Sequence, residues 1–85
     1  MNSTDVRAVI QDELGRIAPE VDFEAIDPEA NLREQVDIDS MDFLNLVTAL
    51  HERLGLDIPE VDYPNFATLR RAIDYLVQKA QARSP

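Results

Sequence analysis

Three segments of this 85-residue chain repeat apolar side chains at the spacing of an α-helix, and no segment shows the sustained alternation typical of a strand. The segments cover residues 4–18, 40–54 and 69–82. A chain of this length holds one small domain, which we expect to span residues 1–85 with an ordered core over residues 4–82. The pattern predicts an all-α fold, a small four-helix bundle of three long helices and one short one.

Polar residues and helix breakers mark where these helices begin and end. Ser3 or Thr4 is placed to cap the first helix, and Pro19 ends it. Gly55 is placed to terminate the second helix, and Thr68 is placed to cap the last one.

Residues 19–39 interrupt the helical pattern with prolines and an asparagine, yet they carry five apolar side chains. A disordered linker would lack so many apolar residues. We therefore expect a long structured loop between the first two helices, whose apolar side chains pack on the core. These residues are Val21, Phe23, Ile26, Leu32 and Val36. Residues 60–65 include Tyr63 and Pro64 and are expected to form at most one short helical turn. The tail, residues 83–85, is expected to fray.

Charge and composition exclude several classes of function. The net charge is −9, from 17 acidic and 8 basic residues, which argues against nucleic acid and anionic membranes as partners and favours basic patches on other proteins. The chain has no Cys, so disulfides, thiolate chemistry and cysteine-based zinc sites are excluded. No apolar run approaches the length of a membrane span, and the first residues lack the features of a signal peptide. We therefore expect a cytoplasmic monomer.

The helix expected over residues 40–54 has one continuous apolar face. At about 100° per residue, this face is expected to lie in the core. Met41 and Leu44 fall outside it, and two exposed apolar residues at this position indicate a small contact surface for a partner. The core face consists of Phe43, Leu46, Val47, Leu50 and Leu54.

Ser40 lies where an acidic irregular stretch turns into this helix, and its hydroxyl has two candidate roles. Serine is a favoured N-cap residue, so Ser40 is a candidate cap for the helix. The hydroxyl is equally a candidate for modification, because a phosphate ester at a helix start lies near exposed amides and the positive end of the helix dipole. The flanking acids Asp39 and Asp42 oppose a phosphate locally, so the residues alone leave both roles open.

Catalysis by the protein itself is not expected. A serine nucleophile needs a base within hydrogen-bond reach, and the only histidine, His51, lies eleven residues along the same helix, about 16 Å away. The acids Asp37, Asp39 and Asp42 do not have the spacing of an EF-hand loop, so no metal site is expected. Asp39 and Asp42 suit the positive end of the helix dipole.

The segment Asp39-Ser40-Met41, followed by residues 42–50, resembles the Asp-Ser-Leu motif and second helix of acyl carrier proteins. Residues 56–59 (LDIP) and 72–76 (AIDYL) also fall in the order and spacing of that family. The resemblance implies that 4′-phosphopantetheine, taken from coenzyme A, is attached to Ser40. It implies that Asp39 belongs to the motif read by a phosphopantetheinyl transferase, and that the protein carries acyl groups as thioesters and is no enzyme.

The resemblance also implies a recognition surface for partner enzymes on the second helix. The expected partners are the phosphopantetheinyl transferase, an acyl ligase or acyltransferase, and synthase enzymes, all bound transiently. The residues that match the family's recognition positions are Met41, Asp42, Leu44, Thr48 and Glu52.

Several residues depart from the family's fatty acid carriers. Asn45, His51 and Arg53 stand where those carriers tend to have acids, and Tyr63-Pro64-Asn65 replaces an acidic third helix. These departures favour a specialised carrier in a secondary or accessory pathway, with fatty, polyketide or other acyl cargo left open. Phe43, expected to point inward near Ser40, predicts a small pocket for that cargo. The alternative is a noncatalytic interaction domain that keeps the carrier fold.

Overall fold

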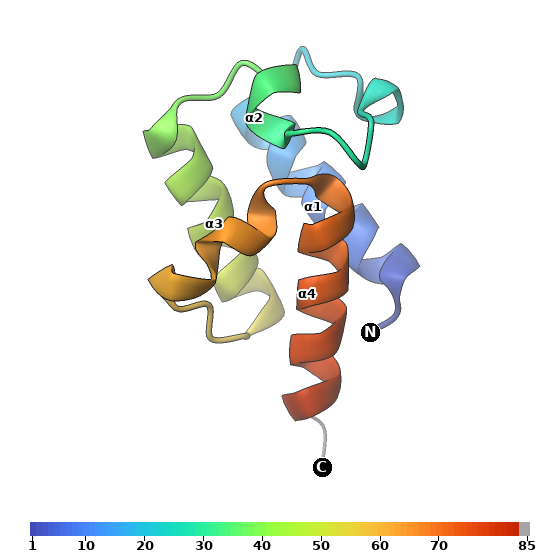
Figure 1. Ribbon diagram of the computed structural model, residues 1–85, viewed down its shortest axis with the longest axis vertical. Coiled ribbons are helices and arrows are strands. Elements are labelled where there is room, and N and C mark those ends of the chain that lie inside the picture. The colour runs from blue at the N-terminus through green and yellow to red at the C-terminus, as the bar shows by residue number, and fades with distance from the viewer. Residues whose placement is uncertain (84–85) are drawn as a thin grey trace.

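The computed structural model describes residues 1–83 and is built around three helices of fifteen residues each (Figure 1). These are α1 (Ser3–Ile17), α3 (Ser40–Leu54) and α4 (Leu69–Arg83). Helix α1 packs against both α3 and α4, which run in the opposite direction to it. Among the described residues, β geometry is confined to one isolated bridge between Asn31 and Thr68. The prediction of an all-α bundle is confirmed.

The long connection between α1 and α3 contains more helix than expected. It includes a 3₁₀ turn, η1 (Phe23–Ala25), and a short helix, α2 (Leu32–Gln35). The Asn31 side chain accepts a hydrogen bond from the amide of Glu34 at 3.2 Å and so begins α2. The sequence analysis counted Asn31 among the interruptions of the helical pattern, but within the long structured loop it caps a short helix.

The same connection packs on the core, as the sequence predicted. Phe23, Leu32 and Val36 are buried, and Val21 and Ile26 are half-buried against them. The core face expected on α3 is confirmed at its centre, where Leu46, Val47 and Leu50 are at most 1% exposed. Its two ends, Phe43 and Leu54, are only half-buried.

Residues 60–66 form a seven-residue 3₁₀ helix, η2 (Glu60–Phe66), so the prediction of at most one short turn was wrong. Pro64 removes one amide donor from η2, but the Asn65 side chain supplies another by donating to the Asp62 carbonyl at 3.0 Å. The Tyr75 hydroxyl of α4 donates to the Asp62 carboxylate at 2.6 Å. Burial and this hydrogen bond raise the pKa of Tyr75, so the phenol remains a donor and holds η2 on α4.

The helix ends show which expected caps are used. Asn2, not Ser3 or Thr4, caps α1 by accepting from the Asp5 amide at 2.8 Å. The Thr68 cap is confirmed by its hydrogen bond from the Arg71 amide at 3.1 Å. Gly55 ends α3 at φ 65°, a left-handed conformation that glycine adopts without a steric penalty.

At the chain end, α4 reaches Arg83, so the fraying expected from residue 83 is not seen at that backbone position. Ser84 and Pro85, the rest of that expected tail, lie outside the described residues. None of the helices in residues 1–83 has the length and apolarity that crossing a bilayer requires.

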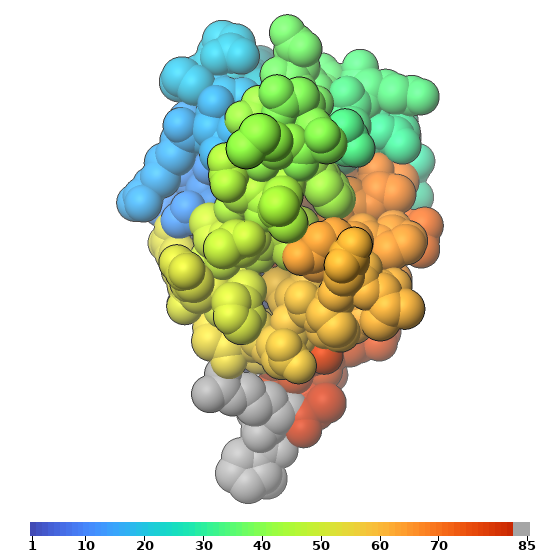
Figure 2. Space-filling model, turned by 90° about the vertical axis from the view of Figure 1, so that its left-hand side faces the viewer, coloured from blue at the N-terminus to red at the C-terminus, as the bar shows by residue number. Residues whose placement is uncertain are grey.

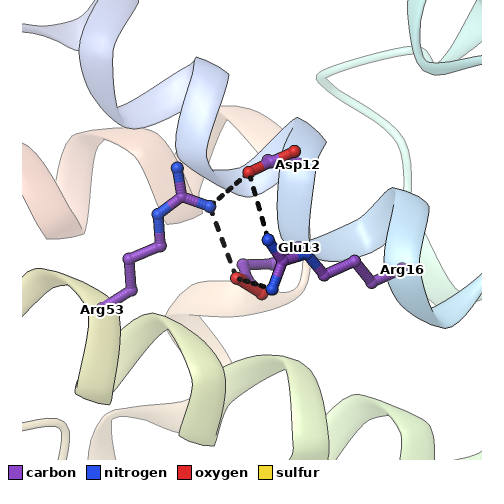
Figure 3. A network of polar contacts seen from close by, with 4 residues as sticks. All are labelled: Asp12, Glu13, Arg16 and Arg53. Carbon is purple, nitrogen blue, oxygen red and sulfur yellow. Dashed lines mark hydrogen bonds and ion pairs between the residues drawn. The ribbon is translucent and has the colours of Figure 1, made fainter.

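A network of charged side chains joins the end of α3 to α1 (Figure 3). Arg53 of α3 donates hydrogen bonds to Asp12 and Glu13 of α1, and Arg16 lies 3.7 Å from Glu13 on the same helix. The hydrogen bond and charge of Arg53 hold the pKa of Asp12 below its ordinary value. The network therefore ties the C-terminal turn of α3 to α1 by charge as well as by packing.

We predict that the contribution of Arg53 to stability depends on pH. The pKa of Asp12 is depressed in the folded protein, so its contribution is present above the ordinary value of 3.8 and is lost as pH falls through the lower folded value. Urea unfolding of wild type and Arg53→Gln should therefore differ in free energy at pH 7, and this difference should shrink as the pH falls below 3.8, the ordinary pKa of Asp12. Asp12→Asn is the matched control and should remove the same pH dependence. A difference that stays constant from pH 7 to pH 3 would contradict this account.

Candidate functional site

The start of α3 is closed by a reciprocal pair of hydrogen bonds between two aspartates. Asp39 is the N-cap, and its carboxylate accepts from the Asp42 amide at 2.8 Å. The Asp42 carboxylate in turn accepts from the Asp39 amide at 3.4 Å, which completes a capping box. The candidate role of Ser40 as the N-cap is therefore wrong.

Ser40 is left as the first residue of α3, exposed to solvent and not needed by the helix. Within residues 1–83 its hydroxyl makes no hydrogen bond, and neither do the amides of Ser40 and Met41. An exposed, unpaired hydroxyl beside two free amides fits the attachment of a group through a phosphodiester, whose oxygens those amides are able to bind.

The backbone that leads to Ser40 is fixed by two buried side chains. Val36 and Ile38 are 2% and 7% exposed, and the Asp37 side chain between them is exposed. The Ile38 amide donates to the Val36 carbonyl at 2.8 Å, which fixes the turn at Asp37. Ser40 is thus presented at a helix start whose preceding residues are anchored in the core.

The recognition residues expected on α3 lie on its solvent side. Met41 and Leu44 are 71% and 47% exposed, and Thr48 and Glu52 are also exposed. Their spacing places them along one face that leads away from Ser40. Figure 2 looks toward this side of the molecule, where the green and yellow segment of α3 runs beside the orange segment of η2. Asp42, expected as a contact residue too, is half-buried and engaged in the capping box.

A shallow groove of about 300 Å³ opens where α2, the first turn of α3 and η2 meet, and its lining includes Asn31 and Arg33 of the α2 segment. Phe43 lies at its edge, only half-buried, so the expectation that it points into the core is wrong in part. The Tyr63 ring meets the Phe43 ring edge-on at 6.5 Å, and the Arg33 guanidinium lies 5.4 Å from the centre of the Phe43 ring. The sequence analysis missed Arg33 as a site residue, because no local pattern relates it to Phe43 ten residues later.

Comparison with known proteins places the chain in a family. Residues 4–76 match the family model described as a phosphopantetheine attachment site. The acyl carrier proteins of Rubrobacter xylanophilus and Thermosynechococcus vestitus are each 32% identical over 77 residues, covering 91% of this chain and 89% of each relative. The acyl carrier protein of Syntrophobacter fumaroxidans is 36% identical over 74 residues, covering 87% of this chain and 85% of the relative.

The chain belongs to the acyl carrier protein family. The resemblance seen in the motif at Asp39-Ser40-Met41 is confirmed. The cofactor of the family is 4′-phosphopantetheine, and the match includes the whole of α3. Members of the family are carriers that enzymes act upon, not catalysts.

His51, Asp39 and Asp42 are titratable side chains of this acyl carrier that lie away from Ser40 or are used structurally. His51 is exposed, and its Nδ1–H donates to the Leu56 carbonyl at the far end of α3. Within residues 1–83, no three His, Asp or Glu side chains gather closely enough to hold a metal ion. Asp39 and Asp42 use their carboxylates on the helix start.

We predict that Ser40→Ala and Asp39→Ala differ in stability. Ser40 makes no capping bond, so its replacement should leave the free energy of unfolding nearly unchanged, whereas loss of the Asp39 cap should cost about 1 kcal/mol. Urea denaturation of both variants and wild type measures this. Equal destabilisation by the two substitutions would show that Ser40 does take part in capping.

Proposed function

We propose that Ser40 is the residue that bears the 4′-phosphopantetheine arm and that the protein carries acyl groups as thioesters on it. The observation that supports this most directly is the capping box, because Asp39 and Asp42 satisfy the helix start and leave the Ser40 hydroxyl exposed and unpaired. Ser40 also lies within the matched residues 4–76. We propose one carrier domain over residues 1–85.

The arm, when attached, supplies the thiol that this Cys-free chain lacks. The chain's own residues hold the attachment point and present it. Ser40 offers the oxygen that bonds to phosphorus, and the buried side chains of Val36 and Ile38 keep that oxygen in place. Asp39, through its capping bond, keeps the hydroxyl of Ser40 available, and we propose that the transferase reads Asp39 in this position.

The exposed face of α3 is proposed as the surface on which partner enzymes dock. Met41 and Leu44 give it an apolar centre, and Thr48 and Glu52 give it a polar and acidic edge, with Asp42 beside Ser40. A phosphopantetheinyl transferase, an acyl ligase or acyltransferase, and synthase enzymes would use it in turn. A small contact of this kind suits partners that must bind and leave quickly.

We further propose that these partners belong to a specialised or accessory pathway. Asn45, exposed on α3, carries no charge. Arg53, at the end of α3, forms ion pairs with Asp12 and Glu13 of α1. The acidic residues within α3 are Asp42 and Glu52, near its two ends. This distribution favours partners that bind α3 through apolar contacts as much as through charge.

We expect one phosphopantetheinyl group on the wild-type protein after incubation with coenzyme A and a broad-specificity phosphopantetheinyl transferase. Intact-mass measurement should show this single addition in wild type and none in Ser40→Ala. The matched control is Ser3→Ala, because Ser3 is also exposed and is also the first residue of a helix capped by the preceding side chain. Ser3→Ala should be modified like wild type.

Other outcomes have definite meanings. Addition to Ser40→Ala would move the attachment site elsewhere. No addition to folded wild type by an active transferase would favour a noncatalytic interaction domain that keeps the carrier fold.

We also predict that Met41→Ala lowers kcat/KM of the transferase reaction by roughly fivefold, about 1 kcal/mol, because a largely exposed apolar side chain next to Ser40 lies where the enzyme must contact the carrier. Val61→Ala is the matched control, since Val61 is also apolar and 82% exposed but lies on η2. Steady-state kinetics with each variant as substrate measures this. An equal loss in both variants would argue against a docking surface centred on α3.

A further inference from the structure

Gln35, the last residue of α2, uses both ends of its side-chain amide on the loop that precedes α2. Its Oε1 accepts from the Asp27 amide at 2.7 Å, and its Nε2 donates to the Asp27 carbonyl at 2.9 Å. The same Nε2 lies 3.3 Å from the Ala30 carbonyl and 3.4 Å from the Asn31 carbonyl. This set of contacts needs a side chain that donates and accepts at once, which a carboxylate or an alkyl group is unable to do.

The loop that Gln35 binds is itself attached around the start of α4. The Arg70 amide donates to the Pro28 carbonyl at 3.0 Å, and the Leu32 amide donates to the Ala67 carbonyl at 2.8 Å. Gln35 therefore joins the end of α2 to backbone that the start of α4 holds in place.

The end of α2 lies close to Ser40 along the chain, because only four residues separate Gln35 from Ser40. The Val36 amide donates to the Leu32 carbonyl at 3.0 Å, and the Ile38 amide donates to the Val36 carbonyl at 2.8 Å. Figure 1 shows this short connection running from α2 to the start of α3 without a helix of its own. Its path is therefore set by α2 at one end and by the capping box at the other.

We propose that Gln35 is a positioning residue for the modification of Ser40. By holding the end of α2 on the loop, its amide fixes the path of residues 36–39 and keeps the start of α3 in the arrangement that a phosphopantetheinyl transferase binds. The contacts of Gln35 are exposed, so water competes for them, and their loss should loosen this connection without unfolding the bundle. This inference rests on the proposed function, because the connection leads to the reacting hydroxyl only if Ser40 bears the arm.

Steady-state kinetics of a broad-specificity phosphopantetheinyl transferase, with the carrier as the varied substrate, tests the positioning role. In Gln35→Ala, only the fraction of molecules with an ordered connection is competent to bind, so we expect KM to rise roughly fivefold while kcat stays unchanged. Gln35→Glu keeps the acceptor but loses the donor, and it should behave like Gln35→Ala at pH 7. Gln78→Ala is the matched control and should match wild type, because the exposed Gln78 side chain on α4 makes no hydrogen bond within residues 1–83.

Amide hydrogen exchange separates a positioning role from a role confined to the loop. Loss of the Gln35 contacts should speed exchange at the Asp27 amide directly and at the Ile38 amide through the connection, each by roughly tenfold. Exchange at Leu50, in the buried centre of α3, should stay unchanged. Faster exchange at Asp27 alone, with exchange at Ile38 and the transferase KM both unchanged, would overturn the inference.

Failure of the proposed function gives a different result. Intact mass first shows whether Ser40 receives the arm, and addition to Ser40→Ala or none to wild type counts against the proposed function and, with it, the inference. A wild type modified at Ser40, with Gln35→Ala at the wild-type KM, overturns the inference alone. If the amide spectrum shows that Gln35→Ala is unfolded, Gln35→Glu serves for both measurements. Unfolding of both variants would also overturn the inference, because Gln35 would then support the whole bundle.

Discussion

The capping box between Asp39 and Asp42 is the interaction on which the functional end of this molecule depends. A helix start leaves backbone amides that need partners, and a serine at that position would ordinarily be used to satisfy them. Here two carboxylates take that role, so the Ser40 hydroxyl takes no part in capping the helix. The capping box therefore fixes the backbone of the helix start and leaves the Ser40 hydroxyl unpaired at the same time.

The attachments of α3 to its surroundings differ from one side to the other. Toward α1, the helix is held by buried aliphatic packing and by the Arg53 network with Asp12 and Glu13 (Figure 3). Toward η2, near its start, Phe43 makes an edge contact with Tyr63 beside an open groove. The contacts with α1 therefore hold the helix in place, whereas the side toward η2 leaves an open groove beside Phe43.

The sequence predicted the three long helices because apolar periodicity reports directly which face of a helix is buried. It was less informative about caps, since Asn2 and Ser3, like Asp39 and Ser40, are adjacent residues of similar capping strength, and only the backbone geometry decides between them. The extent of η2 was underestimated because the donor that compensates for Pro64 is a side chain.

Met41, Leu44, Thr48 and Glu52 were expected outside the core face of α3 and are exposed, because the apolar periodicity that marks the buried face of a helix also marks its solvent side. A small pocket near Phe43 was predicted, but its lining was not, because the lining requires Arg33, Phe43 and Tyr63, from three separate elements, to meet in space. The role of Asp42 in the cap was likewise hidden, since a carboxylate two residues after a serine fits a dipole, a cap or a contact surface equally well.

The distribution of positive charge leaves most of the acidic surface available to partner proteins. Most described cations are paired within the molecule, so an approaching enzyme meets a surface of mainly uncompensated acids, and salt screens that attraction over about 10 Å at 0.1 M. Raising the salt concentration should therefore slow the encounter with partners, because charge complementarity acts mainly on the rate of association.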